Sequence, residues 1–325
     1  MKIKSLHIKN FKSLVDVEII DPNPFTVFVG ANGVGKSNIF EALEFHLLNM
    51  SDDLKLRLFG GAKQVSNVKL SSNYTIAIKT DTFQIVREGD YFSSETKGLP
   101  GRIISVELNN DFEKEYVEKF QNIFSRIFIE KEKYQKINYS DSAKLNLSAS
   151  NLEKVLKRLL IDENKREEIK ELLQLLVPGF ERLEIYSDNI GSTDRLLIYE
   201  KSFDKPFNKD VLSDGTYNLI CLLTAVLQSD EPQFLCIEEP ENGLTPDVIK
   251  EMVTLFRNAC EEKGHYIWLN THSQTLVSQL TSDEIITVDK INGETKIKQF
   301  KGKDFHGLRM DEAWLTNSLG AGLPW

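Results

Sequence analysis

The sequence has few cysteines, no long apolar run and no excess of basic residues. Its 325 residues include only 3 cysteines, which lack both the paired spacing of a zinc site and the density of a secreted disulfide scaffold. The longest mostly apolar run, 219–227, is about half of the ~20 residues that span a bilayer. Residues 1–12 lack the apolar core of a signal peptide. We therefore expect a soluble cytoplasmic protein without a membrane partner.

The charge balance is acidic. Against 40 Lys and Arg residues stand 49 Asp and Glu residues, a formal net charge of -9. Proteins that coat nucleic acid usually carry a basic excess, so any DNA contact must use a local basic patch. The length allows one large domain or two ordinary ones, and a hydrophobic content of 41% is enough for a sizeable core.

Strand and helix patterns alternate at both ends of the chain. The run Phe25–Val29 predicts a buried parallel strand, and Ser37–Met50 predicts a helix with one apolar stripe. Charged helical segments fill the middle third. We therefore predict an α/β fold with one mostly parallel sheet and an inserted helical lobe. The predicted segments are 1–110 and 181–325 for the α/β part and 111–180 for the helical lobe.

A glycine-rich loop lies between that strand and that helix. Residues 30–37, GANGVGKS, match the pattern GxxxxGK[ST]. In this pattern backbone N–H groups surround phosphate oxygens, Lys36 reaches the outer phosphates and the Ser37 hydroxyl binds Mg²⁺. The alternative is a glycine-rich turn with an incidental lysine, and the flanking strand and helix favour the phosphate site. The predicted nucleotide-binding residues are Gly30, Asn32, Gly33, Gly35, Lys36, Ser37 and Asn38.

A second buried strand ends in acidic residues. The segment 234–241, FLCIEEPE, has four apolar residues followed by carboxylates, as expected where parallel strands of an α/β sheet end at a ligand site. We assign Glu238 as the acid on the magnesium side, holding the ion through water. Glu239 faces the other way in an extended chain, where it can orient or deprotonate an attacking water. The alternative is that both acids only solvate the end of the strand.

Ser213 and Gly215 precede an apolar helix predicted at 217–227. A serine hydroxyl and a glycine N–H at a helix N-terminus can bind an anion. Taken alone, however, the pattern predicts only a helix N-cap.

Together these segments resemble ABC-type ATPases of the RecF, SMC and OLD group, in the compact form known as bacterial AAA ATPases. The order is that of the family, and the matching segments are Ile8–Ser13, the Walker A loop 30–37, the signature LSDGT at 212–216, the Walker B and D-loop segment IEEPENGL at 237–244, and Asn270–Ser273. The resemblance implies that ATP and Mg²⁺ are the cofactors. It also implies that Lys12 approaches the nucleotide and that His272 is the switch histidine near the γ-phosphate. Without the family order, the alternative is that His272 is simply a histidine of the core or of a loop.

The resemblance further implies a homodimer. In the family the signature of one subunit closes over the nucleotide held by the other, so Ser213 and Gly215 would act in trans. Three positions depart from the common pattern: Glu238 stands where Asp is commoner, Thr245 stands where histidine is frequent, and Thr216 ends the signature where transporters have glutamine. Gln64 and Gln84 are both candidates for the glutamine loop.

The implied function is an ATP-hydrolysing homodimer that regulates a separately encoded effector, a nuclease, in bacterial phage defence or genome maintenance. OLD proteins carry a TOPRIM nuclease domain after the ATPase, and the sequence that follows the strand predicted at Glu284–Val288 is too short for one. The alternative is a RecF-like clamp for DNA repair, which binds DNA and requires no effector. Large apolar residues near the C-terminus, Trp314, Leu315, Leu319, Leu323 and Trp325, are expected to pack on the chain's own sheet or helical lobe, or on a partner.

Overall fold

The chain folds into two compact units. The structure, a computed structural model, describes residues 2–48, 52–66, 73–90, 111–129, 142–188, 193–320 and 322. Unit 1 comprises residues 1–124 and 266–325, and unit 2 comprises residues 125–265. Residues 125–180 of the helical lobe predicted at 111–180 belong to unit 2, and residues 111–124 belong to unit 1.

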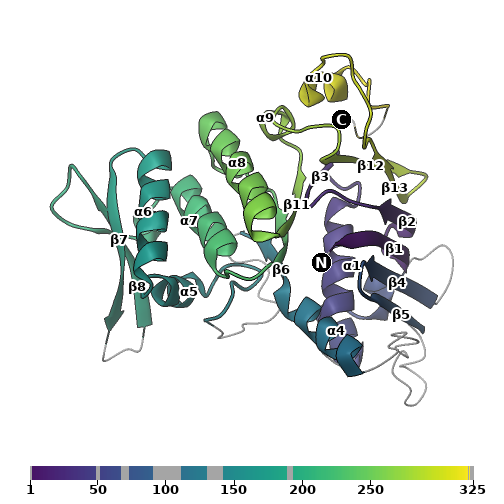
Figure 1. Ribbon diagram of the computed structural model, residues 1–325, viewed down its shortest axis with the longest axis horizontal. Coiled ribbons are helices and arrows are strands. Elements are labelled where there is room, and N and C mark those ends of the chain that lie inside the picture. Colours follow the sequence, from purple (N-terminus) through teal and green to yellow (C-terminus); the bar gives the residue numbers. More distant parts are fainter. Residues whose placement is uncertain are drawn as a thin grey trace. The chain divides into compact units, whose positions relative to one another are not determined.

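Figure 1 shows the helices and strands of the chain and labels those for which there is room. Unit 1 contains β1 (Ile3–Phe11), β2 (Leu14–Ile20), β3 (Phe25–Val29), α1 (Lys36–Leu47), α2 (Asp52–Leu58), α3 (Ala62–Val65), β4 (Asn73–Thr80), β5 (Gln84–Asp90), α4 (Asp111–Ile123), β11 (Tyr266–Thr271), α9 (Gln274–Val277), β12 (Ile285–Ile291), β13 (Glu294–Gln299) and α10 (Met310–Leu315). Unit 2 contains β6 (Phe124–Phe128), α5 (Leu152–Leu159), α6 (Glu163–Leu176), β7 (Phe180–Asp188), β8 (Thr193–Glu200), β9 (Phe207–Asn208), the 3₁₀ turn η1 (Lys209–Val211), α7 (Asp214–Leu227), β10 (Phe234–Glu238) and α8 (Pro246–Lys263).

A mostly parallel sheet forms the centre of unit 1. Its strands follow the order β13-β12-β3-β11. The central strand β3 pairs in parallel with both β11 and β12, and β13 adds an antiparallel edge. Every residue of β3 is buried, which matches the continuous apolar run expected of such a strand. The predicted α/β class with a mostly parallel sheet is confirmed.

The first strands of the chain form a separate sheet, which the prediction of a single sheet missed. Its order is β2-β1-β4-β5, and all neighbouring strands are antiparallel. The antiparallel pairing of β1 and β2 follows from the short connection between them. Two residues, Lys12 and Ser13, join β1 to β2, and so tight a hairpin can only connect antiparallel strands.

Helix α1 contacts both sheets of unit 1 through aromatic side chains. The ring of Phe40 lies 5.5 Å from Phe28 of β3. Further along the helix, Phe45 lies 5.6 Å from Phe11 of β1 and 5.5 Å from Tyr74 of β4. Such edge-on and tilted ring pairs add to the hydrophobic gain of burial. They fix the helix that follows the glycine-rich loop.

Unit 2 combines two buried neighbouring strands, β10 and β6, with helices and a small antiparallel sheet of order β7-β8-β9. Strand β6 lies within the segment predicted as helical. Its sequence, FSRIF, is short and rich in aromatic and β-branched residues, and periodicity alone does not separate such a run from a buried helix turn. Helix α7 starts at Asp214 and is buried along most of its length.

The C-terminal segment packs on unit 1. The side chains of Trp314 and Leu319 are each only 1% exposed. The backbone N–H of Gly322 donates to Asp289 Oδ1 of β12 at 2.8 Å, and the Trp314 indole donates to the Gly322 carbonyl. Packing on the chain's own sheet is therefore correct for Trp314 and Leu319, whereas Leu323 and Trp325 lie outside the described residues.

No helix in the described parts of the chain is both long enough and apolar enough to cross a membrane. The cysteines Cys221, Cys236 and Cys260 are all buried, and none of these three is in a disulfide.

Candidate functional site

The loop between β3 and α1 is packed tightly on one side and open on the other. Gly35 has a φ of 107°, and a Cβ there would lie 2.2 Å from Thr295 Oγ1. A Cβ on Gly30 would lie 2.2 Å from the Val288 carbonyl oxygen. At Gly33, where φ is 77°, a Cβ would meet nothing within 4 Å. Only glycine fits the inner side of the loop, and the outer side leaves room for a ligand.

A hydroxyl network holds the loop from behind. Ser13 Oγ lies 2.6 Å from Thr295 Oγ1, and the Thr295 hydroxyl donates to the Val34 carbonyl at 2.7 Å. The amide of Asn38 donates to Ser13 Oγ at 2.7 Å. Asn38, predicted to bind nucleotide, therefore has its amide directed at Ser13 and holds the loop in shape.

The first turn of α1 suits an anion. It contains no acidic residue and no side-chain cap, and the first N–H groups of a helix have no intrahelical acceptor. The buried Lys36 side chain donates from Nζ to the carbonyls of Gly30 at 2.7 Å and Ala31 at 2.9 Å. An ammonium inside the loop, beside a helix N-terminus, is a donor set that fits phosphate groups.

Two predicted residues of unit 1 lie beside this loop. Ser37 is the second residue of α1, and its Oγ accepts from the Asn270 amide at 3.4 Å. His272 directly follows Thr271, the residue of β11 that pairs with Val29 at the start of the loop. The His272 side chain is exposed. Asn270 is not among the predicted site residues, although it lies in the same segment as His272.

Lys12 lies in the tight turn after β1, with a φ of 50°. Its backbone N–H donates to the Val65 carbonyl at 2.8 Å, and its ammonium forms an ion pair with Glu41 of α1. The structure therefore attaches Lys12 to the helix that carries the loop. The glutamine-loop candidates Gln64 of α3 and Gln84 of β5 are both exposed.

In unit 2, the last residue of β10 is a buried carboxylate paired with an arginine. Glu238 is 5% exposed. Arg126 of β6 donates to Glu238 Oε1 from Nε at 2.7 Å and also from Nη2. Arg126 is not predictable from the sequence, because it precedes Glu238 by 112 positions and belongs to no motif.

The adjacent Glu239 has an unusual backbone. Its φ of 46° lies in the left-handed region, which is costly for a residue with a side chain and is concentrated at functional sites. Its Oε2 accepts from the Asn242 amide at 3.2 Å. The amide of Asn218 on α7 donates to the carbonyls of Pro240 at 3.0 Å and Asn242 at 2.8 Å, which holds the turn.

The signature segment begins α7 in unit 2. The exposed Ser213 hydroxyl accepts from the Thr216 N–H at 3.1 Å, which confirms the predicted N-cap. Gly215 is buried, and a Cβ there would lie 2.0 Å from the Gly243 carbonyl oxygen. This close approach fixes the signature against the turn after β10. An open groove of about 570 Å³ adjoins the segment, lined by Leu175, Leu176, Val177, Pro178, Ser213, Gly215, Thr216, Leu219, Gly243, Leu244, Thr245, Asp247, Val248 and Glu251.

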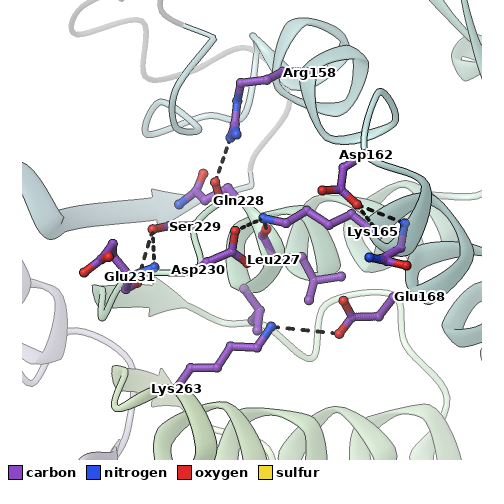
Figure 2. A network of polar contacts seen from close by, with 12 residues as sticks. Arg158, Asp162, Lys165, Glu168, Leu227, Gln228, Ser229, Asp230, Glu231 and Lys263 are labelled. Atoms are coloured by element: carbon purple, nitrogen blue, oxygen red, sulfur yellow. Dashed lines mark hydrogen bonds and ion pairs between the residues drawn. The ribbon is translucent and has the colours of Figure 1, made fainter.

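Basic side chains bind the other end of α7. Figure 2 shows Arg158 donating to the Gln228 carbonyl at 2.7 Å. Lys165 donates to the Leu227 carbonyl at 3.4 Å and pairs with Asp230 at 2.9 Å. Because the C-terminal carbonyls of a helix carry partial negative charge, these contacts stabilise it. Helix α7 is thus held at its signature end and at its far end.

Among the described residues, no three His, Cys, Asp or Glu side chains converge as a metal site. Magnesium is commonly held by one or two protein groups together with substrate phosphates. Ser37 of unit 1 offers a hydroxyl and Glu238 of unit 2 offers a carboxylate, and both are ligand types that Mg²⁺ accepts. Unit 1 contains the predicted phosphate loop with His272, and unit 2 contains the predicted acids and the signature.

The chain is similar to a DNA replication and repair protein, to a chromosome partition protein and to a transporter ATP-binding protein. RecF of Lactococcus lactis subsp. cremoris is 26% identical over 265 residues, 70% of each chain. Smc of Methanococcus voltae is 29% identical over 180 residues, 55% of this chain and 14% of Smc. The energy-coupling factor transporter ATP-binding protein EcfA2 of Lactobacillus gasseri is 32% identical over 75 residues, 23% of this chain and 25% of EcfA2. For Smc and EcfA2, the match spans a quarter or less of the relative's length.

Solved structures of SMC heads share the fold. The SMC head domain from Thermotoga maritima matches with a TM-score of 0.54 at 18% identity, over 92% of this chain and 99% of that one. The Smc head domain of Pyrococcus furiosus, bound to the C-terminal domain of ScpA, matches with a TM-score of 0.61 at 16% identity, over 98% of both.

A family model described as "AAA domain, putative AbiEii toxin, Type IV TA system" matches residues 25–278, most of the chain. The match includes the phosphate loop, both acids, the signature and His272. The chain therefore belongs to this family of AAA domains, with homology to RecF and Smc and with the fold of SMC heads.

Proposed function

We propose that two copies of this chain bind ATP and Mg²⁺, hydrolyse the ATP, and use the cycle to regulate a separate effector. The observation that carries the proposal is the phosphate loop. The Lys36 ammonium lies buried on the carbonyls of Gly30 and Ala31, beside a helix N-terminus without acidic residues. Such a loop is suited to phosphate groups and to little else.

Each residue has a distinct role in the proposed reaction. Lys36 and the loop N–H groups bind the phosphates, and Glu239 accepts a proton from the attacking water. Asn242 orients Glu239 through the 3.2 Å contact. His272, which follows β11, would lie near the γ-phosphate. Ser37 and Glu238 would hold Mg²⁺, which would supply neutralising charge, so catalysis would be mainly positioning and electrostatics.

The proposed dimer uses the signature in trans. Ser213 is exposed at the N-terminus of α7, beside the open groove. In the dimer, Ser213 and Gly215 of one copy close over the nucleotide held by Lys36 of the other. A two-fold axis then creates two equivalent sites.

Mixing two inactive variants tests the trans arrangement. Lys36→Ala removes the phosphate lysine, and Ser213→Arg places bulk where the γ-phosphate would lie. A heterodimer of the two variants has one site with both lesions and one intact site. Verified heterodimers should recover ATP turnover that neither homodimer shows, up to about half of the wild-type rate if the sites act independently. If the intact site gives no turnover in heterodimers that bind ATP, the trans arrangement is wrong.

The proposed effector is a nuclease encoded separately, in phage defence or genome maintenance. The family description names a putative toxin of a type IV toxin–antitoxin system, and a solved Smc head binds the winged-helix domain of ScpA. Both support a partner protein for this fold. Co-expression with the products of neighbouring genes tests the idea: a nuclease should co-purify and cleave DNA only in one nucleotide state. A chain that leaves all of these products unbound in every nucleotide state would contradict it.

A second candidate is a RecF-like DNA clamp, favoured by the match to RecF over 70% of both chains. A lysine-rich segment in unit 1 offers a local basic patch. The Nζ atoms of two of its lysines lie close to the centre of the Phe300 ring, that of Lys298 at 5.4 Å and that of Lys303 at 5.5 Å. Fluorescence anisotropy with duplex DNA at increasing salt tests this candidate. A clamp should bind DNA in an ATP-dependent and salt-sensitive way, and Lys303→Gln should weaken that binding. DNA binding that depends neither on ATP nor on Lys303 would exclude the DNA clamp.

A further inference from the structure

Glu238 and Arg126 form a buried ion pair at the proposed metal-side acid. Their side chains are only 4% and 5% exposed, respectively. The Nε and Nη2 groups of Arg126 both donate to the same carboxylate oxygen, Oε1. A guanidinium does not lose its proton in proteins. The carboxylate therefore already has a full positive charge beside it.

This pairing conflicts with a permanent role of Glu238 as a magnesium acid. A cation is attracted to a carboxylate by its charge, and an adjacent guanidinium cancels most of that attraction in a poorly solvated site. Two hydrogen bonds also occupy lone pairs on Oε1. A Glu238 carboxylate bound to Arg126 is thus a weak ligand for a metal ion. A carboxylate released from Arg126 is a strong ligand.

From this geometry we propose that Arg126 is a positioning residue that acts as a latch on Glu238. The proposal rests on the proposed function, in which Glu238 is the metal-side acid. Without nucleotide, Arg126 neutralises the buried carboxylate. When Mg²⁺ enters with ATP, Glu238 exchanges Arg126 for the metal. The latch makes metal binding depend on nucleotide, because a metal ion that arrives without ATP must displace the guanidinium from Glu238 by itself.

The position of Arg126 supports a role beyond packing. Among the other members of β6, Phe124, Ser125 and Ile127 are buried and Phe128 is half-buried. A charged residue is rarely fully buried unless it is paired. A buried ion pair seldom stabilises a fold more than apolar residues of the same size. Stability alone therefore gives little reason to keep Arg126 opposite Glu238.

The test uses four chains: wild type, Arg126→Met, Glu238→Gln and the double variant. Methionine keeps much of the length of arginine without its charge. Arg126→Lys is the second variant if Arg126→Met folds poorly, since it keeps the charge and loses the paired geometry. The control pair is Arg182 and Glu184, whose 3.0 Å ion pair lies on the surface of the same unit.

The first measurement is Mn²⁺ affinity by electron paramagnetic resonance, with and without a non-hydrolysable ATP analogue. Arg126→Met should tighten Mn²⁺ binding without nucleotide by roughly tenfold, within the usual range of coupling between linked sites. With the analogue bound, the difference from wild type should largely vanish. Arg182→Met should change neither value. If Arg126→Met leaves nucleotide-free Mn²⁺ affinity unchanged, the latch is wrong.

The second measurement is the melting temperature of the four chains, with and without Mg²⁺ and the analogue. Without ligand, the two single variants should each melt earlier, and the double variant should recover part of the loss, since a buried charge without a partner is costly. With ligand, this coupling should disappear, because the pair is already separated. Coupling that persists unchanged with ligand identifies a structural ion pair and overturns the latch.

These outcomes distinguish a failure of the latch from a failure of the proposed function on which it rests. If Glu238→Gln leaves Mn²⁺ affinity unchanged in the presence of the analogue, Glu238 is not the metal-side acid, and that part of the proposed function fails. If Glu238→Gln weakens Mn²⁺ binding but Arg126→Met has no effect on it, only the latch fails.

Discussion

The amide of Asn242 donates to Oε2 of Glu239 at 3.2 Å, at a position where the Glu239 backbone has a φ of 46°. A strained backbone is kept only where the surrounding structure fixes it. Here the amide of Asn218 fixes the turn through the carbonyls of Pro240 and Asn242. The chain therefore holds one carboxylate in a defined place directly after a buried strand.

Glu239→Gln should keep ATP binding and lower ATP turnover by roughly 10²-fold or more, the usual contribution of a general base. Asn242→Ala should lower turnover less, because it removes only the orientation of the base. Phosphate release and binding of a fluorescent ATP analogue check both variants. Glu163→Gln, on an exposed position of α6, is the control. Normal turnover by Glu239→Gln would assign water activation to another group.

Gly35→Ala should abolish tight nucleotide binding, whereas Gly33→Ala should weaken it by roughly tenfold or less. Both residues have positive φ, which costs an L-residue about 1–2 kcal/mol. A Cβ at Gly35 would also meet Thr295 Oγ1 at 2.2 Å, and one at Gly33 would meet nothing within 4 Å. Titration with the fluorescent analogue measures the difference. Equal losses for the two variants would mean that the hydroxyl network does not shape the loop.

Leu319→Ala should destabilise the protein by about 2–5 kcal/mol, the cost of removing a buried leucine side chain. Leu319 is 1% exposed. Leu308→Ala is the matched control, since Leu308 is 41% exposed. A chain that ends at Ser318 should also melt earlier. Unchanged melting of the shortened chain, with loss of a partner, would show instead that this segment is an interface.

Stability should fall at acidic pH because of His46. Burial, with the charges of Arg87 and Lys55, holds the pKa of His46 well below 6.5. The unfolded chain then binds a proton more readily than the folded chain. This contribution is complete above about pH 6.5 and is lost as the pH falls below that value. Melting temperatures from pH 7.5 to 5 should decline less for His46→Leu than for wild type, and His306→Leu, at an exposed site, should follow wild type. A parallel decline in all three chains would assign the acid sensitivity to other groups, such as His265, whose pKa burial also lowers.

Local patterns predicted the parts of the site that are contiguous in the sequence. The phosphate loop follows β3 directly, and Glu238 ends β10, so strand, loop and helix signals each lie within a few residues. The N-cap at Ser213 was likewise predictable from the residue type and the helix that follows. Periodicity and glycine spacing are sufficient for such features.

Contacts between distant segments were not predictable in this way. Arg126 reaches Glu238 across 112 positions, and Thr295 reaches Ser13 across 282. Neither Arg126 nor Thr295 belongs to a motif, and a contact between residues far apart in the sequence leaves no local periodic signal. The separate antiparallel sheet was missed for a related reason, because a strand pattern does not specify which strand will be its neighbour.

The most direct test of the central claim, that ATP brings two copies of this chain together, is the mass of Glu239→Gln in solution by light scattering. Without nucleotide it should have the mass of a single chain, and with ATP and Mg²⁺ it should have twice that mass. Lys36→Ala should stay at the single-chain mass under both conditions. If Glu239→Gln binds ATP, as measured on the same sample, and still has the mass of one chain, the account of ATP-driven closure is wrong.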